Sequence, residues 1–265
     1  MTRNQQPADS ALKQFRAKAV IDWLDVEILT ERPTQHQHIR KALKNITGIN
    51  RWWAGAIDMQ PGDVTDTFHI RFHDELANNY QQLCAVLDAL SRRFPFAAEP
   101  TISGIEVSCD FRHKQQSVDA TRTLTYRMQT SLFATGTNHR QYNGDNNSNQ
   151  FLDKPGNRIN PAYNLRIGNE DDDISWQCYH KRIDKKQPLP IDQQRARVEV
   201  TLQGDALQQH GFGLLSELPN FRFETLSSLF TFRRPIPSEM MHKNNPFEQR
   251  LMAWVRACKD ITAAR

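Results

Sequence analysis

The chain has 265 residues, enough for one large domain or for a domain with an appendage. Hydrophobic residues make up 38% of it and charged residues 24%, and it has no apolar run long enough to span a membrane. The polar N-terminus lacks the apolar stretch of a secretory signal peptide. Four scattered cysteines without a Cys-x-x-Cys pair indicate buried thiols in a reducing compartment, so we expect a cytoplasmic protein.

The net charge of +4 is too small to indicate a nucleic-acid partner by itself, but it is unevenly distributed. From Arg222 to Arg265 there are eight Lys or Arg and four Asp or Glu, which equals the excess of the whole chain. We expect residues 233–265 to form a basic helical segment, with a helix over 246–261. Such a segment suits a polyanionic partner, and a solvated surface explains it nearly as well.

The first half of the chain alternates expected strands and helices after a flexible lead-in over residues 1–18. Beta-branched and aromatic residues predict a strand over 20–28. A helix follows from Pro33 to about Thr47. The alternating segment 67–72 predicts a second strand, and Asp74 caps a longer helix that reaches about Phe94.

Strands dominate the second half. They are expected over residues 102–111, 123–133, 164–167, 175–181 and 196–202. The third and fourth of these form a hairpin around a turn that begins at Gly168, and a polar insertion over 136–161 precedes them. This order of elements predicts an α+β fold, with a central antiparallel β-sheet and helices packed on it.

Tyr179 is the most informative residue of the hairpin. Because side chains alternate along a strand, Tyr179 and Lys181 share one face, and Arg197 and Glu199 share one face of a later strand. Together they have the chemistry to cut a phosphodiester: a phenol attacks phosphorus, cations offset phosphate charge and a carboxylate helps to hold a metal. An amphipathic hairpin with a solvated polar face explains these residues equally well.

Glu106, Asp110 and Glu199 are the candidate metal ligands. Glu106 and Asp110 share a strand face, but they lie about 13 Å apart on an ideal strand that rises ~3.3 Å per residue. That is too far for one ion unless the strand bends, so Asp110 with Glu199 is the safer pair. Oxygen ligands favour Mg²⁺ or Mn²⁺ over Zn²⁺. Polar strand faces also carry such carboxylates without any ion.

Five tyrosines compete for the role of nucleophile. Tyr80 lies on the apolar face of an expected helix, and Tyr126 lies on an expected strand without an obvious cation. Tyr142 and Tyr163 lie in or just after the polar insertion. Only Tyr179 combines a rigid element with a lysine on the same face, so we rank it first, with Tyr163 second and Tyr142 third.

Short motifs follow one another over about residues 20–203. They are Ile21-Asp22-Trp23-Leu24, the pair Glu106 and Asp110, Leu165-Arg166-Ile167-Gly168-Asn169, Tyr179-His180-Lys181 and Arg197-Val198-Glu199. In order and approximate spacing they resemble the replication initiation factors of rolling-circle plasmids, and more distantly the replication proteins of filamentous phages. Each motif is short, and the shared order makes the set moderately specific.

The resemblance implies a metal-dependent, site-specific single-strand endonuclease and strand transferase, with its nicking domain over 19–232. Tyr179 would attack one strand at an origin and form a 5′-phosphotyrosine link, and the reverse reaction would rejoin the strands without ATP. Lys181 and Arg197 would offset phosphate charge beside Mg²⁺ or Mn²⁺. The implied partner is single-stranded or hairpin origin DNA, with a host helicase and a homodimer as further partners and no membrane.

Three other functions fit the same residues. A non-enzymatic DNA-binding replication or phage accessory protein would bind DNA without Tyr179 and yield no covalent product. A hydrolytic metal nuclease would use water as nucleophile, with Tyr179 only packing. A mobilisation relaxase would share the tyrosine chemistry but serve a different biological role.

Overall fold

A computed structural model describes residues 12–50, 52–55, 62–134, 140–143, 149–150, 164–184 and 186–232. The elements, in chain order, are β1 (Phe15–Thr34), α2 (His36–Thr47), β2 (Ala54–Gly55), β3 (Thr65–His73), α3 (Asp74–Ala77), α4 (Tyr80–Ser91), β4 (Thr101–His113), α5 (Val118–Ser131), β5 (Leu132–Phe133), β6 (Arg140–Asn143), β7 (Asn149–Gln150), β8 (Asn164–Ile167), β9 (Ile174–Lys181), β10 (Ile183–Asp184), β11 (Gln187–Pro188), η1 (Ile191–Gln193), β12 (Arg195–Gln203), α6 (Asp205–Gln209), η2 (Leu215–Asn220), η3 (Phe223–Leu229) and β13 (Thr231–Phe232).

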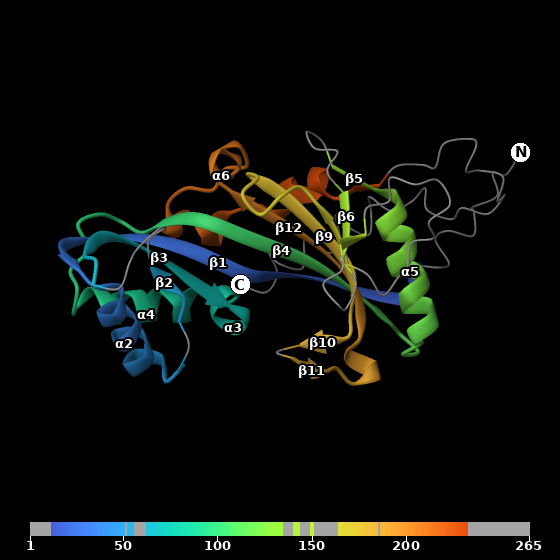
Figure 1. Ribbon diagram of the computed structural model, residues 1–265, viewed down its shortest axis with the longest axis horizontal. Coiled ribbons are helices and arrows are strands. Elements are labelled where there is room, and N and C mark those ends of the chain that lie inside the picture. The colour runs from blue at the N-terminus through green and yellow to red at the C-terminus, as the bar shows by residue number, and fades with distance from the viewer. Residues whose placement is uncertain are drawn as a thin grey trace, which may run out of the picture. The chain divides into compact units, whose positions relative to one another are not determined.

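The described residues form an α+β fold around one large antiparallel sheet (Figure 1). Its nine strands lie in the order β2-β3-β1-β4-β12-β9-β8-β6-β7. The predicted fold class is therefore confirmed. None of the helices in the described part of the chain has the length and hydrophobicity needed to cross a bilayer.

The chain divides into two compact units. One comprises the chain up to Val20, Ser108–Val200 and the segment from Phe223, and the other comprises Ile21–Val107 and Thr201–Arg222. The predicted boundaries of the nicking domain, after residue 18 and after residue 232, stay predictions.

In the first unit, helix α5 fixes which way β9 faces. Gln129 of α5 donates a hydrogen bond to the backbone carbonyl of Cys178 at 3.0 Å. On β9, Trp176, Cys178 and His180 are buried. The Trp176 indole also donates to the carbonyl of Leu229 at 2.8 Å. Because strand side chains alternate, this burial leaves Tyr179 and its neighbours at odd-numbered positions on the other face.

The predicted hairpin is present as β8 and β9, with Leu165 opposite Cys178 and Ile167 opposite Trp176. Gly168 opens its turn with a φ of +84°, a conformation that L side chains rarely adopt. A Cβ there would also meet the backbone carbonyl of Ile174 at 3.1 Å, so the turn requires glycine. Strands β6 and β7 fall within the predicted insertion and continue the sheet beyond β8.

The second unit has an ordinary hydrophobic core. Strands β1 and β3 pair antiparallel, from Trp23 opposite His73 to Ile28 opposite Phe68. Buried side chains on these strands include Leu24, Val26, Ile28, Phe68, Ile70 and Phe72. Helices α2 and α4 pack on each other and lie together on one side of these strands (Figure 1), with Leu43 and Leu87 buried.

The predicted strand over 123–133 was wrong, because Val118–Ser131 forms helix α5. Its threonines and aromatic residues favour a strand on propensity alone. Ser117, however, caps a helix by accepting a hydrogen bond from the amide of Ala120 at 3.2 Å. Leu124 and Met128, four residues apart, are both buried as one helical stripe.

The single helix predicted from Asp74 to Phe94 was also wrong, because the chain forms two shorter helices, α3 and α4. Asn78 leaves the helical path and bonds the backbone of Ile21 through both amide atoms, at 3.0 and 2.6 Å. Asn79 then caps α4 by accepting from the amide of Gln82. Two asparagines therefore end one helix and begin the next.

Candidate active site

One face of the sheet in the first unit carries buried charges. On β12 the odd positions Arg195, Arg197 and Glu199 are polar, and the even positions between them are apolar. On β4, Ser108 and Asp110 supply the matching polar positions. The side chains of this face belong to residues that are at most 9% exposed on β12 and at most 2% exposed on β4. Charges buried this deeply are costly unless they are paired or hydrogen-bonded.

Glu199 is the centre of this group. Its Oε1 accepts a hydrogen bond from the hydroxyl of Tyr179 at 2.6 Å. The same oxygen lies 3.3 Å from Ser108 Oγ and 3.2 Å from Arg197 Nη1, both of which donate to it. Tyr179 is half-buried and Glu199 is only 3% exposed. The phenol therefore points at a carboxylate that Ser108 and Arg197 hold in place.

Asp110 anchors a group of arginines. It accepts from Nε of Arg197 at 2.5 Å and from Nη2 at 2.9 Å, a bidentate pair. Nε of Arg195 lies 2.8 Å and Nη2 of Arg112 lies 3.5 Å from its Oδ2. Burial alone would raise the pKa of Asp110, but the hydrogen bonds from Arg197 and the positive charges of all three arginines outweigh it. The pKa is therefore held below its ordinary value.

The two predicted cations have different surroundings. Arg197 is 2% exposed and divides its guanidinium between Asp110 and Glu199, so it positions both carboxylates. Lys181 is on the same face of β9 as Tyr179, and its Nζ lies 3.1 Å from Asp184. With 12% of its side chain exposed, its ammonium group is closer to solvent than the Arg197 guanidinium.

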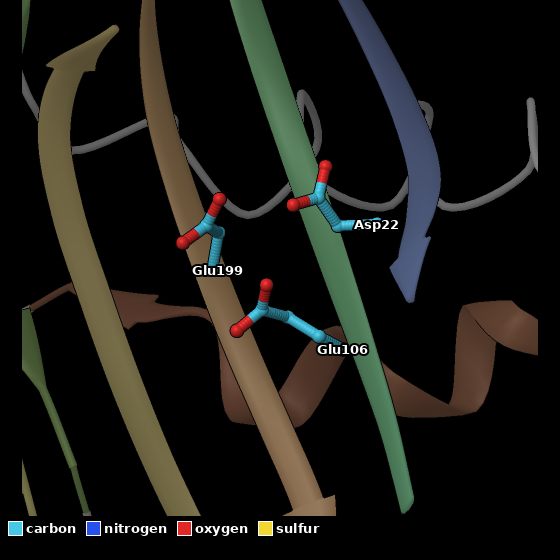
Figure 2. Close-up of side chains that lie close together, drawn as sticks. All are labelled: Asp22, Glu106 and Glu199. Atoms are coloured by element: carbon cyan, nitrogen blue, oxygen red, sulfur yellow. The ribbon is translucent and has the colours of Figure 1, made fainter. Parts of the chain in front are cut away.

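Three carboxylates meet where β1, β4 and β12 run side by side. One oxygen from each of Asp22, Glu106 and Glu199 lies within 4.8 Å of the others (Figure 2). The hydrogen bonds along β4 and β12 agree with this placement, since Ser108 bonds Glu199 and, two residues along each strand, Glu106 accepts from Thr201 at 2.9 Å. The donor set is all carboxylate oxygen, which suits Mg²⁺ or Mn²⁺.

The structure brings together most of the residues singled out from the sequence. Tyr179, Arg197, Glu199 and Asp110 are linked by direct contacts. Glu106 lies with Glu199 in the carboxylate group, whereas both oxygens of Asp110 face guanidinium groups. The roles assigned to all these residues, including metal binding by Asp110, stay predictions.

Sequence reasoning assigned no role to Asp22, Ser108, Arg112 or Arg195. The sequence could have indicated two of them. Asp22 lies within the opening motif, and Arg195 lies two residues before Arg197 and therefore on the same strand face. Among the competing tyrosines, Tyr126 lies on helix α5 and is 40% exposed. Tyr163, the predicted insertion between 151 and 161, and the basic segment 233–265 lie outside the described residues.

Comparisons with solved structures include an alignment over nearly the whole chain. The rolling-circle replication initiator protein from Geobacillus stearothermophilus aligns with probability 1.00 over 94% of this chain and 97% of that one, at a TM-score of 0.45 and 13% identity. A C-terminal regulatory domain of aspartate kinase from Porphyromonas gingivalis W83 aligns over 50% of this chain and 81% of its own, at a TM-score of 0.22 and 11% identity. No protein-family model and no curated protein sequence matches the chain. Both TM-scores are low, so the proposal that follows rests on the site residues.

Proposed function

We propose that the protein initiates rolling-circle DNA replication by nicking one strand of an origin, with Tyr179 as the nucleophile. The observation that carries the proposal is the 2.6 Å hydrogen bond from the Tyr179 hydroxyl to buried Glu199. Such a bond orients the phenol oxygen and gives its proton an acceptor. The resemblance of the Tyr-x-Lys and Arg-Val-Glu motifs to plasmid initiators supports the same chemistry.

In the proposed reaction the phenol oxygen of Tyr179 attacks phosphorus while its proton passes to Glu199. A new bond joins the tyrosine to the 5′ phosphate, the bond from phosphorus to the 3′ oxygen breaks, and that oxygen takes up a proton. The resulting 3′ hydroxyl primes synthesis. Because the phosphotyrosine keeps the energy of the broken ester, the reverse reaction rejoins strands without ATP. Lys181 offsets the charge that develops on the phosphate.

The carboxylate group of Asp22, Glu106 and Glu199 is our proposed site for Mg²⁺ or Mn²⁺. Three carboxylates whose oxygens lie within 4.8 Å repel one another unless a cation or protons compensate them. When bound, the ion would polarise the scissile phosphate. Asp110 is already neutralised by arginines, so we place the ion with the other three residues.

The proposed substrate is origin DNA that is unpaired at the nick, either as a single strand or as the loop of a hairpin. Chemistry on one strand requires a phosphodiester that the protein can reach outside a duplex. A host helicase and a second copy of the chain are further proposed partners, because strand displacement must follow the nick. Such a reaction takes place where plasmid DNA is replicated, in the cytoplasm.

A covalent-adduct assay tests the proposal. The protein is incubated with Mn²⁺ and a pool of single-stranded DNA hairpins with randomised loops, labelled at the 3′ end because that fragment stays on the protein. We expect a labelled band that survives SDS in the wild type and in the control Tyr126→Phe, and none in Tyr179→Phe. Cleavage without any adduct would favour a hydrolytic nuclease, and binding without cleavage would favour an accessory DNA-binding protein.

A further inference from the structure

Arg112 and Arg195 are two cations beside the site that the proposed reaction does not use. Arg112 lies on β4 with 35% of its side chain exposed, and Arg195 begins β12 with 11% exposed. Both guanidinium groups approach the same carboxylate, that of Asp110, at 3.5 and 2.8 Å. Arg112 therefore lies at the solvent-exposed edge of the charged group that contains Glu199, and Arg195 is buried within that group.

Arg195 is the more buried cation of the two. The carboxylate of Asp110 lies 2.8 Å from its Nε, and the charge of Asp184 also acts on it. Burial lowers the pKa of Arg195, the charges of Arg197 and Arg112 lower it further, and the charges of Asp110 and Asp184 raise it, with a net lowering. An additional anion would favour the charged form of a cation that is buried in this way.

The guanidinium donors of both arginines are partly available. Nη1 of Arg195 donates to the carbonyl of Gln193 at 2.9 Å, and its Nε faces Asp110. Arg112 contacts Asp110 through Nη2 alone. Within the described ranges, no side chain or carbonyl accepts from Nη2 of Arg195 or from Nε and Nη1 of Arg112. Planar guanidinium groups with free N–H donors match the oxygens of a phosphate.

We propose that Arg112 and Arg195 bind a second phosphate of the DNA strand, farther along the strand than the one that Tyr179 attacks. Arg195 is four residues from Glu199 on β12, about 13 Å along a strand that rises ~3.3 Å per residue. That offset places the arginine pair away from the reacting phosphorus, beside a phosphodiester farther along the strand. Contacts to backbone phosphates fix the register of a strand, so this site sets which bond reaches Tyr179. The inference rests on the proposed function of Tyr179.

The salt dependence of DNA binding tests this site. All variants carry Tyr179→Phe, so that no cleavage complicates the measurement, and the probe is a short fluorescently labelled oligothymidylate. Arg112→Gln removes the charge that has only one, long, contact with Asp110, so the fold should be retained; its unfolding midpoint is compared with the parent. Arg122→Gln on helix α5 is the matched control. Arg122 is exposed, and its charge lowers the pKa of His180, which lies on the opposite face of β9 from Tyr179.

We expect Arg112→Gln to lower the slope of log binding constant against log salt by about 0.7, the value for one phosphate contact of a single strand. Arg122→Gln should keep the parent slope. An unchanged slope in Arg112→Gln, or an equal loss in both variants, would overturn the second phosphate site. The binding measurement does not depend on cleavage. If the wild type formed no adduct, the Tyr179 proposal would fail, whereas the salt slope of Arg112→Gln would still show whether Arg112 binds a phosphate.

Discussion

Replacing Asp110 with asparagine distinguishes two roles for this residue, that of a structural anchor for the arginines and that of a metal ligand. The carboxylate of Asp110 is 2% exposed and faces Arg197, Arg195 and Arg112, so its loss takes the closest carboxylate contact from a buried group of three guanidinium groups. Removing one partner of a buried ion pair costs about 3–5 kcal/mol of unfolding free energy. At roughly 2–4 °C per kcal/mol for a chain of about this size, we expect the unfolding midpoint to fall by roughly 6–20 °C.

The assay is thermal unfolding of Asp110→Asn at neutral pH, with Asp173→Asn as control because Asp173 is an exposed turn residue with the same charge change. The folded pKa of Asp110 lies below its ordinary value of 3.8, so its contribution is present above that pH and is lost as pH falls through the folded pKa. Asp110→Asn should therefore lose less stability on acidification than the wild type. A midpoint equal to that of the control, with reduced Mn²⁺ affinity, would refute the anchor role.

Three further outcomes follow from the site. Lys181→Ala should slow cleavage by roughly 10²–10³-fold, as loss of one electrostatic stabiliser does, and a single-turnover rate equal to wild type would contradict this. Glu106→Gln should raise the Mn²⁺ concentration needed for half-maximal nicking. Undiminished nicking in EDTA would show that the reaction needs no metal. Burial, followed by the charges of Arg182 and Arg122, lowers the pKa of His180 from 6.5 to about 4. Stability should therefore fall as pH drops from about 6.5 toward 4, and urea midpoints of His180→Phe should lack that fall.

The sheet and its polar face could be predicted because strand alternation is a local signal. The placement of Tyr179 with Lys181, and of Arg197 with Glu199, needed only the period of two residues and the hairpin turn at Gly168. Helix α5 was mistaken for a strand because its β-favouring threonines outweighed Ser117, the residue that caps the helix. Here a capping hydrogen bond and a buried helical stripe overrode local propensity.

The partners of each charge could not be predicted, because they depend on which strands become neighbours. Asp110 and Glu199 are 89 positions apart in the chain and share Arg197 only because β4 lies next to β12. The same neighbour relation brings Glu106 to Glu199, and β1 adds Asp22. Motif spacing therefore located the strands, whereas strand order decided which carboxylate faces arginines and which faces other carboxylates.

Mapping the covalent adduct to one residue tests the central claim most directly. After the labelled DNA is trimmed with a nuclease, tryptic digestion separates the competing tyrosines, since Tyr142, Tyr163 and Tyr179 fall on peptides 141–158, 159–166 and 167–181. We predict by mass spectrometry that the nucleotide remnant is on peptide 167–181, at Tyr179. A remnant on peptide 159–166 or 141–158 would move the nucleophile to Tyr163 or Tyr142 and contradict the account.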